Sequence, residues 1–330
     1  MKYLNRRQMQ FCLAAILTTP VAMAQSSSTT TYPDQPIKLV VGYAPGGQAD
    51  THARILGKLL SASLGQPVVI ENKPGAGTTI AGAYVAQSKP DGYTLLMAGA
   101  SLLTIAPYTY SSLRFKISDF QPVSLTSLIP VGLVINQKAL PVSDFKEFVA
   151  YTKANPGKVS YATTGPGGAS HLLGELIKAR TGADMTVVHY KGSGPAMPDL
   201  LAGRVQAMVD SLPPHLPHIA VGTELGLAIS ADRRLPGAPT VPTFAEAGFP
   251  DLAMGSWNGI LVVRGTPQPI IDKLHRALVA AVASEEFQKR VIADAIIPIT
   301  DTPAEFEALI QRDSKIWGEV IQKIGGIKLD

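Results

Sequence analysis

The sequence predicts an α/β protein of two domains, each a mainly parallel sheet flanked by helices. Short apolar runs recur along the chain, and each is followed by a loop rich in glycine or proline and then by a helical pattern. Strands that alternate with helices in this way favour parallel sheets. The 330 residues suffice for two domains, and 46% hydrophobic with 16% charged residues are typical of a soluble protein.

The first 24 residues are predicted to be a secretory signal peptide, and residues 25–31 a disordered leader. Basic residues precede an apolar run and a small-x-small cleavage pattern, at Lys2, Arg6, Arg7, Phe11–Leu17 and Ala22–Ala24. The leader is rich in serine and threonine and has no periodicity. The chain is therefore expected to be exported, by either the general or the twin-arginine route.

Cysteine content and charge narrow the classes of partner. Cys12 is the only cysteine and lies within the predicted signal, so the mature chain is expected to lack disulfides. Removal of residues 1–24, which carry three basic and no acidic residues, lowers the net charge from +4 to +1. No stripe of lysine and arginine points to nucleic acid, and no internal apolar run approaches the roughly 20 residues of a membrane span.

In the first third of the chain, three strands each run into a glycine-containing loop. The strands are predicted at residues 37–41, 68–70 and 94–97. A helix that begins near Asp50 is predicted from apolar residues at helical spacing and a terminal glycine, which are Ala53, Leu56, Leu60, Leu64 and Gly65. A second helix, rich in small residues, runs through Ala86.

The middle of the chain begins with a buried strand at residues 131–135. A helix follows, which Ser143 is predicted to cap and Asn155-Pro156-Gly157 to end. One face of this helix is apolar and consists of Phe145, Phe148, Val149 and Thr152. The helix is expected to pack on a sheet through that face.

Three more strand–loop–helix units are predicted next, with strands at residues 159–163, 185–190 and 205–210. Thr243 to Glu246 is a capping box for a short helix that Gly248 closes.

The last part of the chain is predicted to be mostly helical. A strand at residues 260–263 precedes an amphipathic helix from about 269 to 283. A capping box at Thr302–Glu305 begins a long final helix, whose apolar residues are Phe306, Leu309, Ile310 and Trp317.

Two of the glycine loops are predicted to bind an anion. In the loops at residues 42–47 and 163–168, a strand ends, two glycines follow a proline, and a helix begins. Glycine lets a ligand approach the backbone, and the first N–H groups of a helix favour negative charge. Because ligands of such sheets lie beyond the carboxyl ends of the strands, the two loops are expected to face each other across a cleft.

The sequence does not support a phosphate-binding loop, a nucleophile elbow or a metal site. Gly165–Gly168 lacks the lysine and hydroxyl residue of a phosphate-binding loop, and Gly192-Ser193-Gly194 is not a nucleophile elbow. His215 and His218 are three residues apart, but no third metal ligand is obvious. No metal and no cofactor are therefore expected.

Three residues have two readings each. Asp50 either contacts the ligand or caps a helix, and His171 either lines the cleft or packs beside it. Asp210 ends an apolar strand, where a carboxylate needs a partner. It either receives a donor from the ligand or holds a neighbouring loop.

Five motifs carry a resemblance to a known family. They are Tyr43–Gly47 with Asp50 and Arg54, Val69–Gly77, Lys89–Leu95, Tyr190–Ala196, and Pro239–Thr243 with Glu246 and Gly248. In this order they resemble the tripartite tricarboxylate transporter receptors, also called Bug-type extracytoplasmic solute receptors. The resemblance spans the mature chain and implies a periplasmic solute-binding receptor, not an enzyme.

The resemblance implies a Venus-flytrap fold whose chain crosses twice between domains, near residues 127–130 and 255–258. Domain 1 would be residues 32–127 plus 258–330, and domain 2 residues 128–257. The implied ligand is a small organic carboxylate, the implied partners are membrane transporter subunits, and the receptor is expected to be a monomer.

The residues implied in ligand binding lie in the loops of both domains. Binding would rely on backbone N–H groups, hydroxyls and ordered water rather than on an arginine. Carried over by position, they are Tyr43, Pro45, Gly46, Gly47, Ala76, Ser101, Thr163, Thr164, Gly167, Ser170, His171 and Asp210.

The ligand is further predicted from Leu102 and Leu103, where many relatives have polar residues. If either leucine faces the cleft, the added apolar wall suits an aromatic dicarboxylate such as terephthalate. The alternative is that both belong to the core.

Two alternative functions stay open. A hydrolase would need a nucleophile and a base in contact, and the candidate pairs are Ser170 with His171 and Ser193 with His189. Adjacent residues on a helix do not face each other, which disfavours the first pair. A sensor would use the same closure to dock on a membrane signalling protein.

Overall fold

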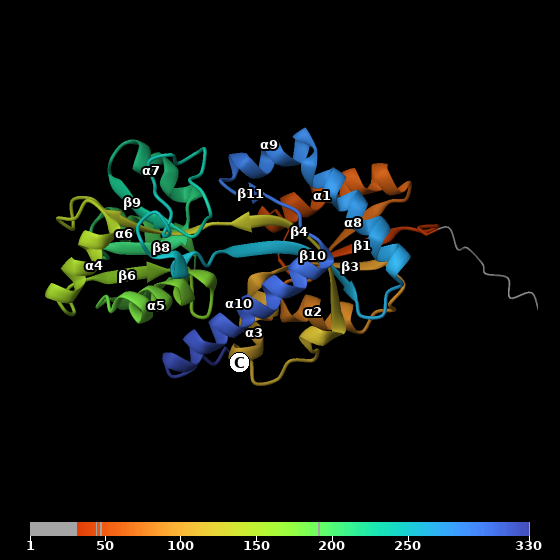
Figure 1. Ribbon diagram of the computed structural model, residues 1–330, viewed down its shortest axis with the longest axis horizontal. Coiled ribbons are helices and arrows are strands. Elements are labelled where there is room, and N and C mark those ends of the chain that lie inside the picture. The colour runs from red at the N-terminus through yellow and green to blue at the C-terminus, as the bar shows by residue number, and fades with distance from the viewer. Residues whose placement is uncertain (1–31, 44, 47, 191, 330) are drawn as a thin grey trace, which may run out of the picture. The chain divides into compact units, whose positions relative to one another are not determined.

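Two β-sheets, each flanked by helices, form the described part of the chain in this computed structural model (Figure 1). The structure describes residues 32–329 apart from Ala44, Gly47 and Lys191. The predicted signal peptide and leader, residues 1–31, lie outside the described residues. Within the described range, no helix combines the length and apolar character that a bilayer span requires.

The first sheet has six strands in the order β11-β4-β10-β3-β1-β2. Strand β1 pairs in parallel with β2 and β3, whereas β10 runs antiparallel to both β3 and β4. Successive residues of β1 enter different cores, because side chains alternate between the two faces of a strand. Leu39 and Val41 pack on one face and Val40 on the other. The strands are β1 (Ile37–Val41), β2 (Val68–Asn72), β3 (Thr94–Gly99), β4 (Phe120–Ile129), β10 (Ser256–Val263) and β11 (Ile297–Pro298).

Helices cover both faces of the first sheet (Figure 1). On the face of Leu39 lie α1 (Gln48–Leu64), α8 (Gln268–Ala283) and α9 (Glu285–Ala293). On the face of Val40 lie α2 (Thr79–Ala86) and α10 (Pro303–Lys323). The predicted apolar faces of α1 and α10 are confirmed, since all four apolar residues of α1 and three of the four named for α10 are buried.

The second sheet has five strands in the order β7-β6-β8-β5-β9. Strand β6 is parallel to β7 and β8, and β5 is antiparallel to β8 and β9. Helices α4 and α5 contribute to the core on one face, and α6 to the core on the other. The strands are β5 (Val131–Asn136), β6 (Ser160–Thr163), β7 (Thr186–His189), β8 (Ala207–Ser211) and β9 (Glu224–Ile229), and the helices are α4 (Phe145–Ala154), α5 (Ala169–Thr181), α6 (Ser193–Leu201) and α7 (Leu216–Ala220).

Short helical turns join these elements. A π-helix and α3 follow β3 directly and bring the chain toward the second sheet's core, which Ile105 enters. The turns are η1 (Ala76–Thr78), η2 (the π-helix, Ser101–Ile105), α3 (Ala106–Thr109), η3 (Ile117–Asp119), η4 (Pro213–His215) and η5 (Pro250–Leu252).

Both sheets are mixed, not mainly parallel as the sequence predicts. The reason lies in the connections between the sheets. Strand β4 ends at Ile129 and β5 of the second sheet begins at Val131, while β10 returns the chain to the first sheet at Ser256. Strands that leave and return side by side run in opposite directions, so β4 and β10 form an antiparallel pair.

Two predicted helix starts are wrong in detail. Asp144, not Ser143, caps α4, because its side chain accepts a hydrogen bond from the Glu147 N–H. The segment after Thr243 is a turn and not a helix. The reciprocal capping bonds between Thr243 and Glu246 are present, but Gly248 with φ +91° ends the turn before a helix can propagate.

Candidate functional site

A cavity of about 310 Å³ lies between the loops of the first sheet and the glycine loop that precedes α5. Larger cavities of about 780 and 680 Å³ lie against α10, but neither is lined by a predicted glycine loop. Among the described residues that line the smaller cavity there is no lysine, arginine or histidine. The lining residues are Tyr43, Gly77, Thr78, Ser101, Ile105, Ala106, Thr109, Tyr110, Pro166, Gly167, Gly168 and Leu329.

Asp50 holds the first glycine loop. Its carboxylate accepts hydrogen bonds from the Gly46 N–H at 2.9 Å, from Nε of Arg54 at 2.9 Å and from Nδ2 of Asn72 at 2.9 Å. The same Asn72 amide donates to the carbonyl of Tyr43 at 3.0 Å. Hydrogen bonding by Arg54 outweighs burial and lowers the pKa of Asp50 to about 2. Asp50 is thus a buried, ionised brace of the loop, which favours the capping reading.

His171 holds the second glycine loop from the equivalent position. In both helices the third residue reaches back to the N–H of the residue two positions before the helix, and here Nδ1 of His171 accepts from Gly167 at 3.1 Å. Nδ1 therefore carries no proton, so the imidazole is neutral. Burial is the main reason that the pKa of His171 falls to about 4. The ring packs edge-to-face on His189, with centroids 4.6 Å apart.

Hydroxyl groups complete the second loop. The Ser170 hydroxyl accepts from the Thr164 N–H at 3.1 Å and lies 2.8 Å from the Thr164 hydroxyl. The Thr163 hydroxyl pairs with Nδ1 of His189 at 2.9 Å. These side chains fix the loop, and their hydrogen bonds leave no nucleophile–base pair between Ser170 and His171.

The backbone N–H groups at the start of α5 are the donors that remain. Those of Gly168, Ala169 and Ser170 have no acceptor among the described residues, as expected for the first turn of a helix. Gly168 also lines the cavity. The N–H groups of Gly46 and Gly167, in contrast, already donate to Asp50 and His171. The free amides of the second loop therefore lie at the helix start and not within the glycine turn.

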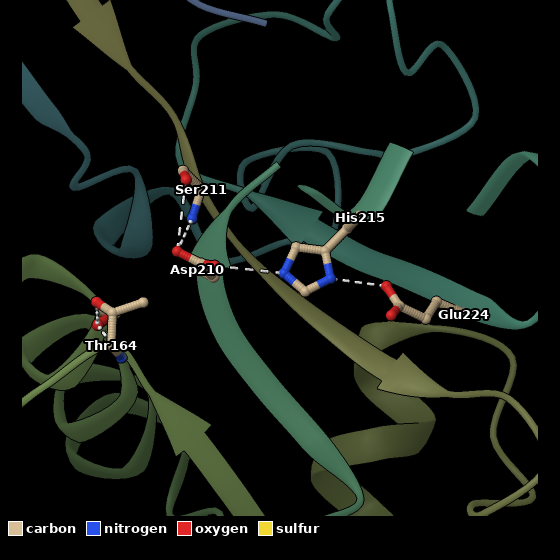
Figure 2. A network of polar contacts seen from close by, with 6 residues as sticks. Thr164, Asp210, Ser211, His215 and Glu224 are labelled. Carbon is tan, nitrogen blue, oxygen red and sulfur yellow. Dashed lines mark hydrogen bonds and ion pairs between the residues drawn. The ribbon is translucent and has the colours of Figure 1, made fainter. Parts of the chain in front are cut away.

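Asp210 is the penultimate residue of β8 and lies next to a buried histidine (Figure 2). One carboxylate oxygen accepts from the Ser211 N–H at 2.7 Å, and the other lies 3.5 Å from Nε2 of His215. Nδ1 of His215 lies 2.7 Å from a carboxylate oxygen of Glu224. Burial alone would lower the pKa of His215, but the contacts with Asp210 and Glu224 outweigh it and raise the pKa to about 9. His215 is thus a buried cation between two acids, with Nδ1 close to Glu224 and Nε2 in a longer ion pair with Asp210.

Thr164 directly follows β6, and Asp210 lies in the neighbouring strand β8 of the second sheet, as Figure 2 shows. Asp210 is 5% exposed and does not line the cavity. Its contacts with Ser211 and His215 correspond to the reading in which it holds a neighbouring loop.

The structure brings some of the predicted site residues to the cavity and places others behind it. Tyr43, Ser101 and Gly167 line it, whereas Ala76 lines a separate cavity of about 490 Å³. Pro45 is exposed and away from the lining, and Gly47 lies outside the described residues. The others, which hold the loops or lie behind them, are Gly46, Thr163, Thr164, Ser170, His171 and Asp210.

Sequence reasoning missed several lining residues. Gly77 and Thr78 directly follow the predicted loop residue Ala76, so their position carried a usable signal. No sequence pattern marked Leu329 as a cavity residue, because it lies several residues beyond the end of the last helix and outside any predicted loop. Leu102 and Leu103 are buried in the core at 1% and 0% exposure and do not line this cavity, which corresponds to the core alternative and not to the cleft wall.

Comparison with known proteins decides the family. Residues 52–326 match the family described as "Tripartite tricarboxylate transporter family receptor". The chain belongs to this receptor family. The protein BugT of Bordetella pertussis is 37% identical over 312 residues, which cover 94% of this chain and 95% of BugT.

Solved structures of similar proteins share the fold. A TctC solute binding protein from Polaromonas gives a TM-score of 0.81 at 27% identity, covering 88% of this chain and 99% of that one. An R. palustris protein with adipate gives a TM-score of 0.74 at 30% identity, covering 90% of this chain and 99% of that one. The MatC protein of Rhodopseudomonas palustris with bound malate gives a TM-score of 0.70 at 32% identity, covering 88% of this chain and 99% of that one.

These matches confirm the predicted two-sheet fold of periplasmic binding proteins, with the sheets mixed as described above. They also confirm that the protein is a substrate-binding receptor and not an enzyme, because the family consists of such receptors. The receptor family binds small carboxylates and works with tripartite membrane transporters.

Proposed function

We propose that the protein captures a small dicarboxylate in the periplasm and delivers it to a tripartite tricarboxylate-type membrane transporter. The observation that carries this proposal is the start of α5, where the N–H groups of Gly168, Ala169 and Ser170 have no acceptor among the described residues. Gly168 lines the cavity, and none of the described lining residues is basic. A carboxylate bound there gains hydrogen bonds from the amides and the favourable end of the helix dipole.

Groups from the first sheet face the other side of the cavity. Tyr43 and Ser101 supply hydroxyls, and Ile105 with Ala106 supplies apolar surface. A ligand with a short apolar centre and two acidic ends matches this distribution, because one acid pairs with amides and the other with hydroxyls or water. The adipate and malate in the structures of the two similar R. palustris proteins are acids of this kind.

Ligand capture is proposed to close two domains, residues 32–127 plus 258–330 and residues 128–257. The observed connections between the sheets, from β4 to β5 and from β9 to β10, support hinges at these places. Hinge closure of this type buries the ligand between loops that face each other.

The preference for an aromatic dicarboxylate such as terephthalate remains a hypothesis. Its original support, an exposed Leu102 or Leu103, is lost because both are core residues. A cavity of about 310 Å³ is at the lower end of the range for ligand pockets, about 300–1,000 Å³. This volume favours compact acids in the observed conformation.

Thermal unfolding with a panel of acids tests the proposed function. Malate, adipate and terephthalate are compared with acetate and with dimethyl adipate, which lacks negative charge. A ligand at about 100 times its Kd stabilises the folded protein by about 2.7 kcal/mol, which raises Tm by several degrees. A rise with at least one diacid but not with dimethyl adipate is expected, and no rise with any diacid would refute the proposal.

A further inference from the structure

The C-terminal tail after α10 returns toward the cavity. Gly325 and Gly326 adopt left-handed backbone angles, with φ of 84° and 85°, and turn the chain at the end of the helix. The Gly326 N–H donates to the carbonyl of Ile321 at 2.8 Å. Beyond the turn, Ile327 packs against the core of the second sheet. The tail is therefore a packed segment with a defined path.

Leu329 connects the two sides of the cavity. Its N–H donates to the carbonyl of Thr109 at 2.9 Å, at the end of α3, and its side chain lines the cavity. The side chain also lies against Gly167, because a Cβ atom built on Gly167 would lie 2.7 Å from Cδ1 of Leu329. A side chain at position 167 would displace this end of Leu329.

Leu329 differs from the other apolar side chains at the cavity in how it is supported. Ile105 is 2% exposed and Ala106 is 2% exposed, and both belong to the π-helix and α3 that the cores hold in place. Leu329 is partly exposed and reaches the cavity from a tail outside both sheets. Its side chain can therefore limit the length of a ligand without taking part in the fold's core.

We propose that Leu329 is a specificity-determining residue, whose side chain forms an apolar end wall beside Gly167 and sets the length of the dicarboxylate that fits. The inference rests on the proposed function, since it concerns ligands of the same cavity. Truncation of Leu329 removes three carbon atoms from the wall and leaves the Thr109 hydrogen bond, which uses the main chain. The space gained accommodates additional methylene groups of a longer diacid.

The expected change in ligand affinity follows from the free energy of transferring apolar groups out of water. Each methylene group that a longer ligand buries is worth about fourfold in Kd, so two of them are worth about tenfold or more. Leu329→Ala is expected to shift the ratio of Kd values for long and short diacids by about tenfold in favour of the long ones. Leu329→Phe is expected to shift the ratio in the opposite direction.

Isothermal titration calorimetry with linear α,ω-dicarboxylates from succinate to suberate tests the inference on the mature protein. Ile327→Ala is the matched control, because Ile327 lies in the same tail but packs on the core and does not line the cavity. The wild type and Ile327→Ala are expected to share one length preference, from which Leu329→Ala departs.

The outcomes separate this inference from the proposed function. If the wild type binds diacids and Leu329→Ala keeps the wild-type length preference, Leu329 does not set specificity and the inference is refuted alone. The same holds if Ile327→Ala shifts the preference as much as Leu329→Ala. If the wild type binds no diacid at all, the proposed function is refuted and the inference with it.

Discussion

Replacement of Ala169 by proline tests whether the amides at the start of α5 bind the carboxylate. Ala169 is the first residue of the helix, where proline fits without breaking an intrahelical hydrogen bond. Gly168, with φ −81° and ψ 170°, already has the extended conformation that a residue before proline requires. The substitution therefore removes one N–H donor and leaves the helix in place.

The expected loss of affinity follows from the charge of the acceptor. A hydrogen bond to a charged group contributes about 1.5–3 kcal/mol, and about 1.4 kcal/mol corresponds to a tenfold change in Kd. Ala169→Pro is therefore expected to weaken diacid binding by about tenfold to a hundredfold. Calorimetric titration with adipate measures this change directly.

Glu285→Pro is the matched control for Ala169→Pro. Glu285 is the exposed first residue of α9 and follows Ser284, which has φ −66° and ψ 144°. Helix α9 packs on the Leu39 face of the first sheet and does not line the cavity. The control is expected to bind adipate as the wild type does. Wild-type affinity in a folded Ala169→Pro variant would show that the carboxylate does not use the start of α5.

Three further predictions concern the groups that hold the loops. Asp50→Asn loses the ion pair with Arg54 and is expected to lower the free energy of unfolding by about 1–3 kcal/mol in denaturant titration. In the wild type this contribution is present above pH 3.8 and is lost as pH falls toward the Asp50 pKa of about 2. Gly42→Ala is expected to destabilise by about 1–3 kcal/mol, since its Cβ would lie 2.6 Å from Cβ of Thr78, and Thr78→Gly is expected to restore the loss in a double-mutant cycle. His215→Gln leaves two buried acids without their cation and is expected to lower the free energy of unfolding by about 3–5 kcal/mol. In the wild type the stabilisation by His215 is fully present below about pH 6.5 and is lost as pH rises through about 9. A denaturation midpoint that did not fall between pH 6.5 and 9.5, relative to His215→Gln, would contradict the assigned charge of His215.

The strands and helices that sequence alone predicts are those with local patterns. Apolar runs predict β1 and β3, and helical spacing with a capping box predicts α10. Strand β4 was missed because it contains Pro122 and several hydroxyl residues, which locally argue against a buried strand. The Thr126 hydroxyl bonds to the carbonyl of Asn258, 132 residues away, so its compatibility with burial is visible only in the folded chain.

The same limit applies to the site. The glycine loops were predictable because strand, turn and helix start are adjacent in sequence. The contact between Leu329 and Gly167 joins segments 162 residues apart, and no local pattern marks it. The choice between core and cleft wall for Leu102 and Leu103 stayed open for a related reason, because the π-helix that begins at Ser101 decides which side chains face the cavity.

The two glycine loops are held by the same geometry but with different charge. Asp50 brings a carboxylate to the start of α1 and needs Arg54 to balance it, whereas His171 holds Gly167 as a neutral ring. The start of α5 therefore keeps its positive potential for a ligand, which the start of α1 does not.

His171→Asp tests this asymmetry, because it copies the brace of the first loop without an arginine beside it. Aspartate can still accept from the Gly167 N–H, so the loop is expected to hold. Two like charges about 6 Å apart at an effective dielectric constant of about 20 repel each other by about 3 kcal/mol, which predicts a loss of diacid affinity of about a hundredfold at low salt. His171→Asn, a neutral acceptor of the same size, is expected to retain most of the affinity. Equal affinities of the aspartate and asparagine variants in calorimetric titration would place the ligand's charge away from α5.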